Sequence, residues 1–484
     1  MGLITTIVGY TSATTARILA VFNEPHGKAF LVYRDGSGVK PALQATITPA
    51  LPYGLAEFQL TGVSGSSVKY FVTDDVSTPP TMALLDGPAA RSFRMVPSNR
   101  PLRVALVSCN DIDNHKYPKA RRAALWKTLG KLVDSGEVDL LVHAGDQIYA
   151  DENPSGWSPT EGRAAAYRRH YVNTWSHPEV AKVMSSCSNI MMWDDHEIYD
   201  GWGSNDGDTS DAAQTRYKAA EKAFREFQDP LNPPDRLEPG LGWIAKYGDM
   251  AILAVDGRSQ RRWAKGTILG KAQLDDLELK LNELSKLHLK HLFVVVGTPV
   301  VFVPLIAAEK LASIFSKSSL DDIRDGWSAS KNRTECRRFL MSLLNFAGLS
   351  PETQVTIVAG DIHVGTLGRI DTELGFGPDR VQPRIFQVTA SGIGRPPPSG
   401  AEAFMLSLIT DGGSQDLFNN DIQGSLVRMN GSDDPFCLRH RNFAVLDPSD
   451  GHGEWDRNGN LWVKFHTELG GGTVLEQLLA RVHG

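Results

Sequence analysis

Side chains that can bind metal ions or transfer protons follow four short apolar runs of this sequence. They are thiol, carboxylate, phenol and imidazole groups, and each set stands where its apolar run stops. A single carboxylate and imidazole after a strand is common, but four such endings in one chain indicate one shared site. The four sets are Cys109 with Asn110, Asp146 with Tyr149, Asp194 with Asp195 and His196, and Asp361 with His363.

The spacing within two of these sets favours a metal centre. Asp146 and Tyr149 are three residues apart on a tight turn, so a carboxylate and a phenol can point at one position. Asp361 and His363 are separated by one residue just beyond a strand, which places both side chains on the same side. Oxygen ligands suit a hard divalent or trivalent cation, and a phenolate is a suitable ligand for iron(III).

The apolar runs themselves predict buried parallel strands. They are short and continuous, and they alternate with segments of helical period. In sheets of this kind ligands bind beyond the carboxyl ends of the strands. We expect strands at 102–108, 139–144, 189–193, 251–255, 292–296 and 355–359, and helices near 119–134, 160–184, 211–228, 272–287 and 334–346.

The N-terminal part of the chain has a different pattern. Residues 1–97 are rich in Thr, Val, Ser and Gly, with short runs separated by turn residues, which predicts an antiparallel β-sandwich. The segment 96–101, ValProSerAsnArgPro, is suited to be a linker. We therefore expect an N-terminal sandwich domain over 1–97 and a second domain over 102–484.

The C-terminal part again favours antiparallel strands. After residue 384, we expect antiparallel strands at ArgIlePheGlnValThr, AsnPheAlaValLeu and LeuTrpValLysPheHis. The last two flank a Gly- and Asp-rich connection and predict a hairpin. The connection, 447–460, is more suited to a hairpin loop than to a calcium loop, because it lacks the EF-hand register. The final segment, ValLeuGluGlnLeuLeuAlaArgVal, is expected to form an amphipathic helix.

Composition excludes several classes of protein. The 484 residues can form two or three domains with a large core, and the four cysteines show no CxxC pair, so we expect reduced thiols. A net charge of -6 gives no basic field, so no stable nucleic-acid partner is expected. No stretch reaches the roughly 18 apolar residues of a membrane span, and the N-terminus lacks the pattern of a signal peptide. We expect no membrane contact and a cytoplasmic location.

Three motifs resemble those of one enzyme family. GlyAspGlnIleTyrAlaAsp at 145–151, TrpAspAspHisGluIle at 193–198 and AlaGlyAspIleHisValGly at 359–365 are similar to the signature of the alkaline phosphatase D (PhoD-like) branch of the calcineurin-like metallophosphoesterases. SerCysAsn at 108–110 and AspGlyTrp at 325–327 extend the resemblance, as does ValGlyTyrThrSerAlaThrThrAlaArgIle near the start. Residues beyond about 400 match nothing closely. The resemblance implies an α/β fold: an αββα sandwich of two mixed sheets flanked by helices, preceded by an immunoglobulin- or fibronectin-like β-sandwich.

The resemblance also implies roles for individual residues. The wider superfamily begins with an AspxHis motif, whereas the PhoD-like branch has SerCys, so Cys109 is similar to a thiolate ligand. His196 matches an imidazole that stabilises or protonates the leaving group. The implied metals are iron(III) and calcium, with zinc or manganese as alternatives. The implied ligands are Cys109, Asp146, Tyr149 and His363 for the first metal, and Asp146, Asp195 and Asp361 for the second.

The activity implied is hydrolysis of a phosphate mono- or diester by a metal-bound hydroxide, with a small phosphoester as the substrate. The alternative is a catalytically silent protein on the same fold that binds phosphoesters or acts as a scaffold. Arg258, two residues beyond Asp256, is a candidate phosphate clamp.

Structural interpretations of the same residues remain open. Cys109 can be a buried small hydrophobe, and His363 a core imidazole. Arg258 can form a structural salt bridge with Asp256 or Asp200, and Asp194 can orient a neighbour. His143, inside a strand, is expected in the core. Arg168 and His170, on the helix near 160–184, are weaker candidates for the pocket, and Trp202 for its entrance.

Overall fold

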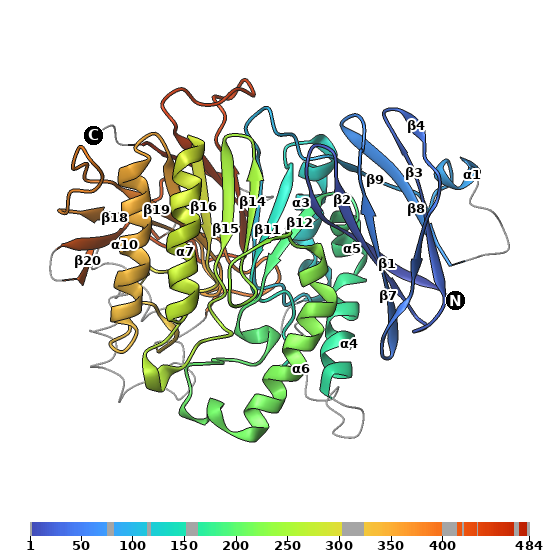
Figure 1. Cartoon of the computed structure of the whole chain (residues 1–484), viewed down its shortest axis with the longest axis horizontal. Coiled ribbons are helices and arrows are strands. Elements are labelled where there is room, and N and C mark those ends of the chain that lie inside the picture. Colours follow the sequence, from blue (N-terminus) through green and yellow to red (C-terminus); the bar gives the residue numbers. More distant parts are fainter. Residues whose placement is uncertain are drawn as a thin grey trace.

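The structure is a computed structural model with four β-sheets, and helices cover the two larger ones (Figure 1). All four cysteines are buried and free. Within the ranges given next, no helix combines the length and the apolar character that crossing a membrane requires. The structure describes residues 2–74, 82–113, 118–151, 163–302, 324–398, 414–418, 421–432, 434–468 and 474–481.

The N-terminal strands form two antiparallel sheets that pack face to face. Alternate residues of β8 are buried, because one face of the strand lies against the opposite sheet. Phe22 and Leu31, from different sheets, meet in the enclosed core. One sheet has the order β1 (Leu3–Thr11), β2 (Ala16–Phe22), β7 (Tyr53–Leu60), β6 (Thr48–Ala50). The other has the order β4 (Gly38–Val39), β3 (Lys28–Asp35), β8 (Ser67–Thr73), β9 (Arg91–Arg94), with β5 (Leu43–Thr46) paired to β3.

The six-stranded sheet carries three of the four predicted strand ends. Its strands β10, β11 and β12 are parallel, and β22, β23 and β24 continue the sheet antiparallel. The order is β12 (Ser188–Met192), β11 (Leu140–Ala144), β10 (Val104–Val107), β22 (Asn442–Asp447), β23 (Leu461–Thr467), β24 (Val474–Leu479).

The nine-stranded sheet carries the fourth strand end. Strands β15, β16, β17 and β19 are parallel, and antiparallel strands extend both sides. The order is β13 (Asp235–Arg236), β14 (Trp243–Tyr247), β15 (Met250–Ala254), β16 (His291–Val295), β17 (Gln354–Ala359), β19 (Ile385–Thr389), β18 (Thr366–Thr372), β21 (Ile422–Leu426), β20 (Ser414–Phe418).

The two large sheets pack against each other, and helices cover their outer faces. Ile252 and Phe293 point into the core shared with the six-stranded sheet. Their neighbours Leu253 and Val294 point the other way, into a second core beneath α7 (Lys271–Leu284) and α10 (Arg333–Leu349). These two helices lie side by side over one face of the nine-stranded sheet (Figure 1). Among the described residues, the remaining helices of four or more residues are α1 (Met82–Leu85), α2 (Lys119–Arg122), α3 (Ala124–Ser135), α4 (Arg163–Trp175), α5 (Pro178–Met184) and α6 (Asp211–Phe227).

This architecture confirms the expected fold class of two mixed sheets flanked by helices and preceded by β-sandwich sheets. The expected hairpin is β22 paired with β23. The run ArgIlePheGlnValThr forms β19, which pairs antiparallel with β18 but parallel with β17, so the expectation of a purely antiparallel strand there is wrong. The expected helix at 160–184 is two helices, since Pro178 begins α5 after a break. The prediction of a C-terminal helix is wrong: Val474–Leu479 is strand β24. Pairing with β23, which lets Leu479 enter the core, overrides the local helical pattern.

The N-terminal sheets pack directly beside the edge strand β12. Ser188 Oγ donates to the Gly9 carbonyl at 3.0 Å, and Asn189 Nδ2 donates to the Val8 carbonyl at 2.9 Å. A side chain at Gly9 would collide with the backbone of Leu231, because its Cβ would lie 2.7 Å from that Cα. The N-terminal part therefore covers an edge that would otherwise be open to pairing with another chain.

Candidate metal centre

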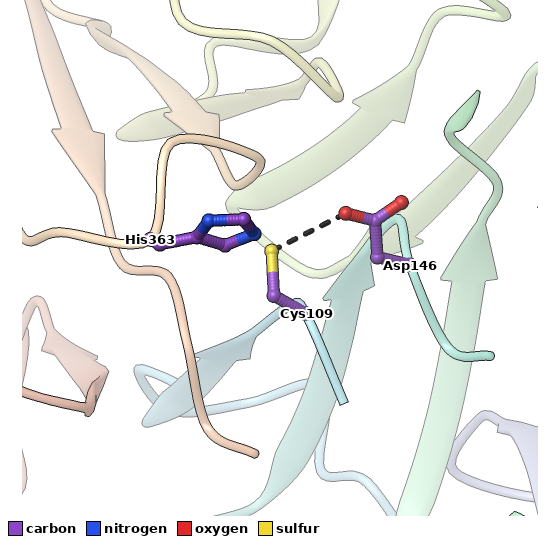
Figure 2. Close-up of side chains that lie close together, drawn as sticks. All are labelled: Cys109, Asp146 and His363. Carbon is purple, nitrogen blue, oxygen red and sulfur yellow. Dashed lines mark hydrogen bonds between the residues drawn. The ribbon is translucent and has the colours of Figure 1, made fainter. Parts of the chain in front are cut away.

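The four predicted strand ends meet at the carboxyl ends of the parallel strands of the two large sheets. Strands β10, β11 and β12 bring the segments after Val107, Ala144 and Met192, and β17 brings the segment after Ala359. Figure 2 shows Cys109, Asp146 and His363 arriving from three separate segments with their side chains pointing toward one another. Segments far apart in sequence thus contribute to a single site.

The first group of candidate ligands contains sulfur, oxygen and nitrogen. One ligand atom each from Cys109, Asp146 and His363 lies within 4.8 Å of the others. Cys109 Sγ is 3.3 Å from Asp146 Oδ2. The Tyr149 hydroxyl is 3.1 Å from His363 Nε2 and 3.4 Å from Asp146 Oδ2. A thiolate, a carboxylate, a phenolate and an imidazole can therefore reach one ion.

The second group is built from carboxylates. Ligand atoms of Asp194, Asp195 and Asp361 lie within 4.8 Å of one another, and so do those of Asp146, Asp195 and His196. Asp146 thus belongs both to the sulfur-containing group and to a group with Asp195. A carboxylate with one oxygen toward each group has the position that bridging two ions requires.

The backbone at this site is strained. Cys109, Asp146, Asp361 and His363 have φ angles of 54°, 55°, 68° and 56°, in the left-handed region that side chains other than glycine rarely adopt. Such conformations each cost about 1–3 kcal/mol and persist where the surroundings fix them, often at functional sites. In the described ranges, the other residues of this kind besides glycine are His288 and Arg380.

Two buried side chains that the sequence analysis did not single out hold these strained segments. The Glu197 carboxylate accepts hydrogen bonds from the backbone N–H groups of Gln147 at 2.6 Å, Asp194 at 2.7 Å and Asp146 at 3.0 Å. Ser391 Oγ lies 3.0 Å from Cys109 Sγ and accepts a hydrogen bond from the His363 N–H at 2.8 Å. Glu197 stands within the TrpAspAspHisGluIle motif, whereas Ser391 follows β19, a strand with no ligand pattern in sequence.

Burial and like charges make this site unfavourable without a cation. Burial raises the pKa of Asp146 well above its usual value, and Asp195 and Asp194 raise it further against the opposing effect of His196. The pKa of Asp361 rises for the same reasons, first burial and then the charges of Asp194 and Asp195. Bound cations would reverse both effects, because opposite charge favours the ionised carboxylate.

Two carboxylate oxygens test whether the residues of this site fit metal ions. Asp194 Oδ2 and Asp195 Oδ1 are buried and form no hydrogen bond in the part of the chain that the structure describes. Arg258 Nη2 lies 3.4 Å from Asp195 Oδ1. Buried carboxylate oxygens without a donor are rare unless an ion or water completes them. The donor set and these two oxygens therefore fit metal ions.

His196 is paired with Asp151, the last residue of the motif at 145–151, for which the sequence predicted no role. His196 Nδ1 is 2.9 Å from Asp151 Oδ1, and Asp151 Oδ2 accepts the Asp200 N–H at 2.7 Å. Burial lowers the pKa of His196, but Asp151, Asp195 and Asp146 raise it more, so the pKa lies well above its ordinary value. The Tyr149 ring lies against the imidazole, with centroids 4.1 Å apart. This arrangement favours the protonated form of the imidazole.

Arg258 is held by neighbouring groups rather than aimed at open space. Its side chain is 1% exposed, and both terminal nitrogens donate to Asp325 at 2.7 Å. Nε donates to Asp194, and Nη1 also reaches the Trp202 carbonyl at 3.1 Å. The guanidinium therefore pairs with the carboxylates of Asp194, Asp195 and Asp325, whereas Asp256 Oδ1 accepts a hydrogen bond from the backbone N–H of Arg258 at 3.1 Å. This geometry favours a positioning role for Arg258 over the phosphate clamp expected from the sequence.

The weaker candidates lie in structural contacts. Arg168 pairs with Glu226 at 2.6 Å and donates to the Leu51 carbonyl, which ties α4 to the N-terminal sheets. His143 is in the core, hydrogen bonded to Gln147 and Asn189. Trp202 is fully buried and donates to the Arg258 carbonyl. His170, on α4, is partly buried, and burial lowers its pKa.

Comparisons with known proteins show the family and the fold of this chain. A family model described as PhoD-like phosphatase matches residues 104–390, which include all eight sequence-predicted site residues. A solved structure of PhoD superposes with a TM-score of 0.65 at 13% identity, covering 99% of this chain and 90% of that one. Among curated proteins, the uncharacterized protein YGR266W of Saccharomyces cerevisiae is 22% identical over 485 residues, covering 75% of this chain and 68% of the relative.

Proposed function

The chain belongs to the PhoD-like phosphatase family, and from this premise we propose that it hydrolyses phosphate mono- or diesters at a centre of two metal ions. Family membership supports a phosphoesterase. The observation that carries the finer proposal is the position of Asp146, which belongs both to the sulfur-containing group and to the group with Asp195 and His196.

The donor atoms suggest how the ions would be held. Cys109, Tyr149 and His363 would bind the first ion, Asp195 and Asp361 the second, and Asp146 both. Phenolate and thiolate favour iron(III), and an all-carboxylate set suits calcium; zinc or manganese are alternatives. When bound, such ions lower the pKa of water to about 7 and neutralise phosphoryl oxygens.

The chain itself would supply the proton for the leaving group. Because His196 Nδ1 faces Asp151, Nε2 is the ring atom that would donate to the leaving oxygen. Asp151 fixes the orientation of the ring and stabilises its charged form. Asp151 in turn is fixed by the Asp200 N–H. The phosphate would then lie between the carboxylate groups and His196.

Hydrolysis of p-nitrophenyl phosphate and bis(p-nitrophenyl) phosphate tests this proposal. The protein would be assayed as purified, after removal of metal with a chelator, and after add-back of iron with calcium, zinc or manganese. We expect turnover to disappear with the metal and to return on add-back. The relative rates with the two substrates then show whether monoesters or diesters are preferred. Metal-free protein that still hydrolyses either ester would contradict the proposal. A folded protein without turnover under every metal condition would instead favour the silent binding or scaffolding alternative.

A further inference from the structure

The segment after β19 is fastened to the first ligand loop. The N–H groups of Gly394 and Arg395 donate to the Cys109 carbonyl at 3.2 and 3.0 Å, and the Ile393 N–H donates to the Ser108 carbonyl at 3.2 Å. A Cβ at Gly394 would lie 2.7 Å from the backbone nitrogen of Asp111, so this close approach requires glycine. The backbone of Arg395 is therefore fixed relative to Cys109.

The side chain of Arg395 reaches over the same group of ligands. Its guanidinium carbon lies 4.8 Å from the centroid of the Tyr149 ring, at cation–π distance. Nη1 donates to Asp111 Oδ2 at 2.7 Å, and the Asp111 side chain is 7% exposed. Because the Tyr149 hydroxyl touches both His363 and Asp146, the guanidinium stands beside the sulfur-containing group of candidate ligands.

The two arginines near the site differ in what they can reach. Arg258 is 1% exposed and its fork is engaged bidentately by Asp325. The Arg395 side chain is 21% exposed, and its ion pair with Asp111 orients it. A planar guanidinium matches the spacing of phosphate oxygens and binds them bidentately. A partly exposed, oriented fork at the ligand cluster is suited to the phosphate of a substrate.

We propose that Arg395 binds a non-bridging oxygen of the substrate phosphate. This inference rests on the proposed function, and it names the group that recognises the anion. A monoester carries a second negative charge that a diester lacks, so Arg395 contributes more to monoester binding. Arg258 instead holds the carboxylates of the metal centre in place.

Kinetics of Arg395→Gln and Arg395→Lys test the inference, with Arg384→Gln as the matched control. Arg384, at the other end of β19, is also a partly exposed arginine paired with a carboxylate, Asp371 at 2.6 Å. For Arg395→Gln we expect kcat/KM toward p-nitrophenyl phosphate to fall about 10- to 100-fold, mainly through KM. Inhibition by inorganic phosphate should weaken by a similar factor, and the effect on bis(p-nitrophenyl) phosphate should be smaller. Arg395→Lys should lose less, and Arg384→Gln should match wild type.

Three results would overturn the inference: unchanged phosphate inhibition in Arg395→Gln, an equal loss in Arg384→Gln, or loss of bound metal or of thermal stability in Arg395→Gln. Calorimetric titration of metal-loaded protein with inorganic phosphate separates the inference from the proposed function. If the wild type binds phosphate but does not turn over, the proposed hydrolysis fails. Weaker phosphate binding by Arg395→Gln would still support the role of Arg395, and unchanged binding would reject it.

Discussion

The two ends of the central strands bury polar atoms in different ways. At the carboxyl ends, Asp194 Oδ2 and Asp195 Oδ1 form no hydrogen bond with the residues that the structure describes. At the opposite end, both ring nitrogens of His291 and the amide atoms of Gln354 likewise form no hydrogen bond to any part of the chain that the structure describes. His291 and Gln354 are direct neighbours at the starts of β16 and β17. Buried polar atoms without hydrogen bonds therefore do not by themselves mark the functional end.

Charge and backbone conformation separate the two ends. The carboxyl ends gather several acids together with four left-handed residues other than glycine. At the opposite end the two buried side chains are uncharged, since burial, followed by Arg481, lowers the pKa of His291 to about 3, and neither His291 nor Gln354 has a positive φ. Like charges and strained backbone are both unfavourable in an isolated chain, so their coincidence indicates a ligand of opposite charge.

Among substitutions that test the difference between the two ends, Asp146→Asn is expected to have the largest effect on metal binding and hydrolysis. Removing the shared carboxylate should abolish binding of at least one ion and lower hydrolysis by more than about 100-fold, since even groups around a ligand contribute 10–100-fold. In metal-free protein the same change should leave the unfolding temperature unchanged or higher, because a costly buried charge is removed. Elemental analysis, kinetics and calorimetry check these outcomes. Lower metal-free stability would mean that Asp146 serves the fold.

The next largest effect is expected at His196. His196→Ala should lower kcat about 10²- to 10⁴-fold with retained metal, because the proton donor is lost. The loss should be greater for alkyl than for p-nitrophenyl leaving groups, since p-nitrophenolate leaves without a proton. Asp151→Asn should give a smaller loss with the same dependence on the leaving group. Equal losses for good and poor leaving groups would contradict the role of His196 as a proton donor.

Asp325→Asn tests whether Arg258 positions Asp194 and Asp195 for metal binding. Arg258 would lose a charged bidentate partner, and breaking a buried pair costs about 3–5 kcal/mol of unfolding free energy. Metal affinity should also weaken by about 10- to 100-fold, because Arg258 contacts Asp194 and Asp195. Denaturant unfolding and metal titration measure the two effects. A loss of stability with unaltered metal affinity would mean that the ion pairs of Arg258 stabilise the fold and do not position the metal ligands.

The smallest effect on activity is expected at the opposite end, for His291→Phe. Because the pKa of His291 is lowered to about 3, the unfolded chain binds more protons than the folded one as pH falls below about 6.5. The contribution that the neutral His291 side chain makes to the free energy of unfolding is fully present above about pH 6.5 and is lost on acidification. Between pH 7 and pH 5, the wild type should lose about 2 kcal/mol that the variant does not. Hydrolysis at pH 7 should be unchanged, and equal acid sensitivity of both proteins would contradict this.

Much of the site could be predicted from sequence because its ligands follow apolar strand runs within short motifs. Cys109, Asp146, Asp195 and His363 are each read from a single strand end, and the parallel sheets bring those ends together. The metals, the substrate and the catalytic roles remain predictions. The boundary between an N-terminal sandwich domain and a second domain, at residues 97–102, also remains a prediction.

The rest depends on contacts between distant segments. The role of Arg395 depends on backbone hydrogen bonds to Cys109, and its local sequence contains no ligand pattern. The partners of Arg258 come from β12 and from the AspGlyTrp motif, so sequence proximity pointed to Asp256 instead. Strand β24 forms against β23, which outweighs the helical period of its own residues.

Elemental analysis of metal-loaded wild type, Asp146→Asn and Gln354→Leu tests the central claim most directly. Gln354 is the matched control, since its side-chain amide is buried at the start of β17 and forms no hydrogen bond within the described residues. We predict two metal ions per chain in wild type and in Gln354→Leu, and loss of at least one in Asp146→Asn. Folded wild-type protein that binds no metal, or Asp146→Asn that binds as much as wild type, would contradict a two-metal centre at the carboxyl ends of the strands.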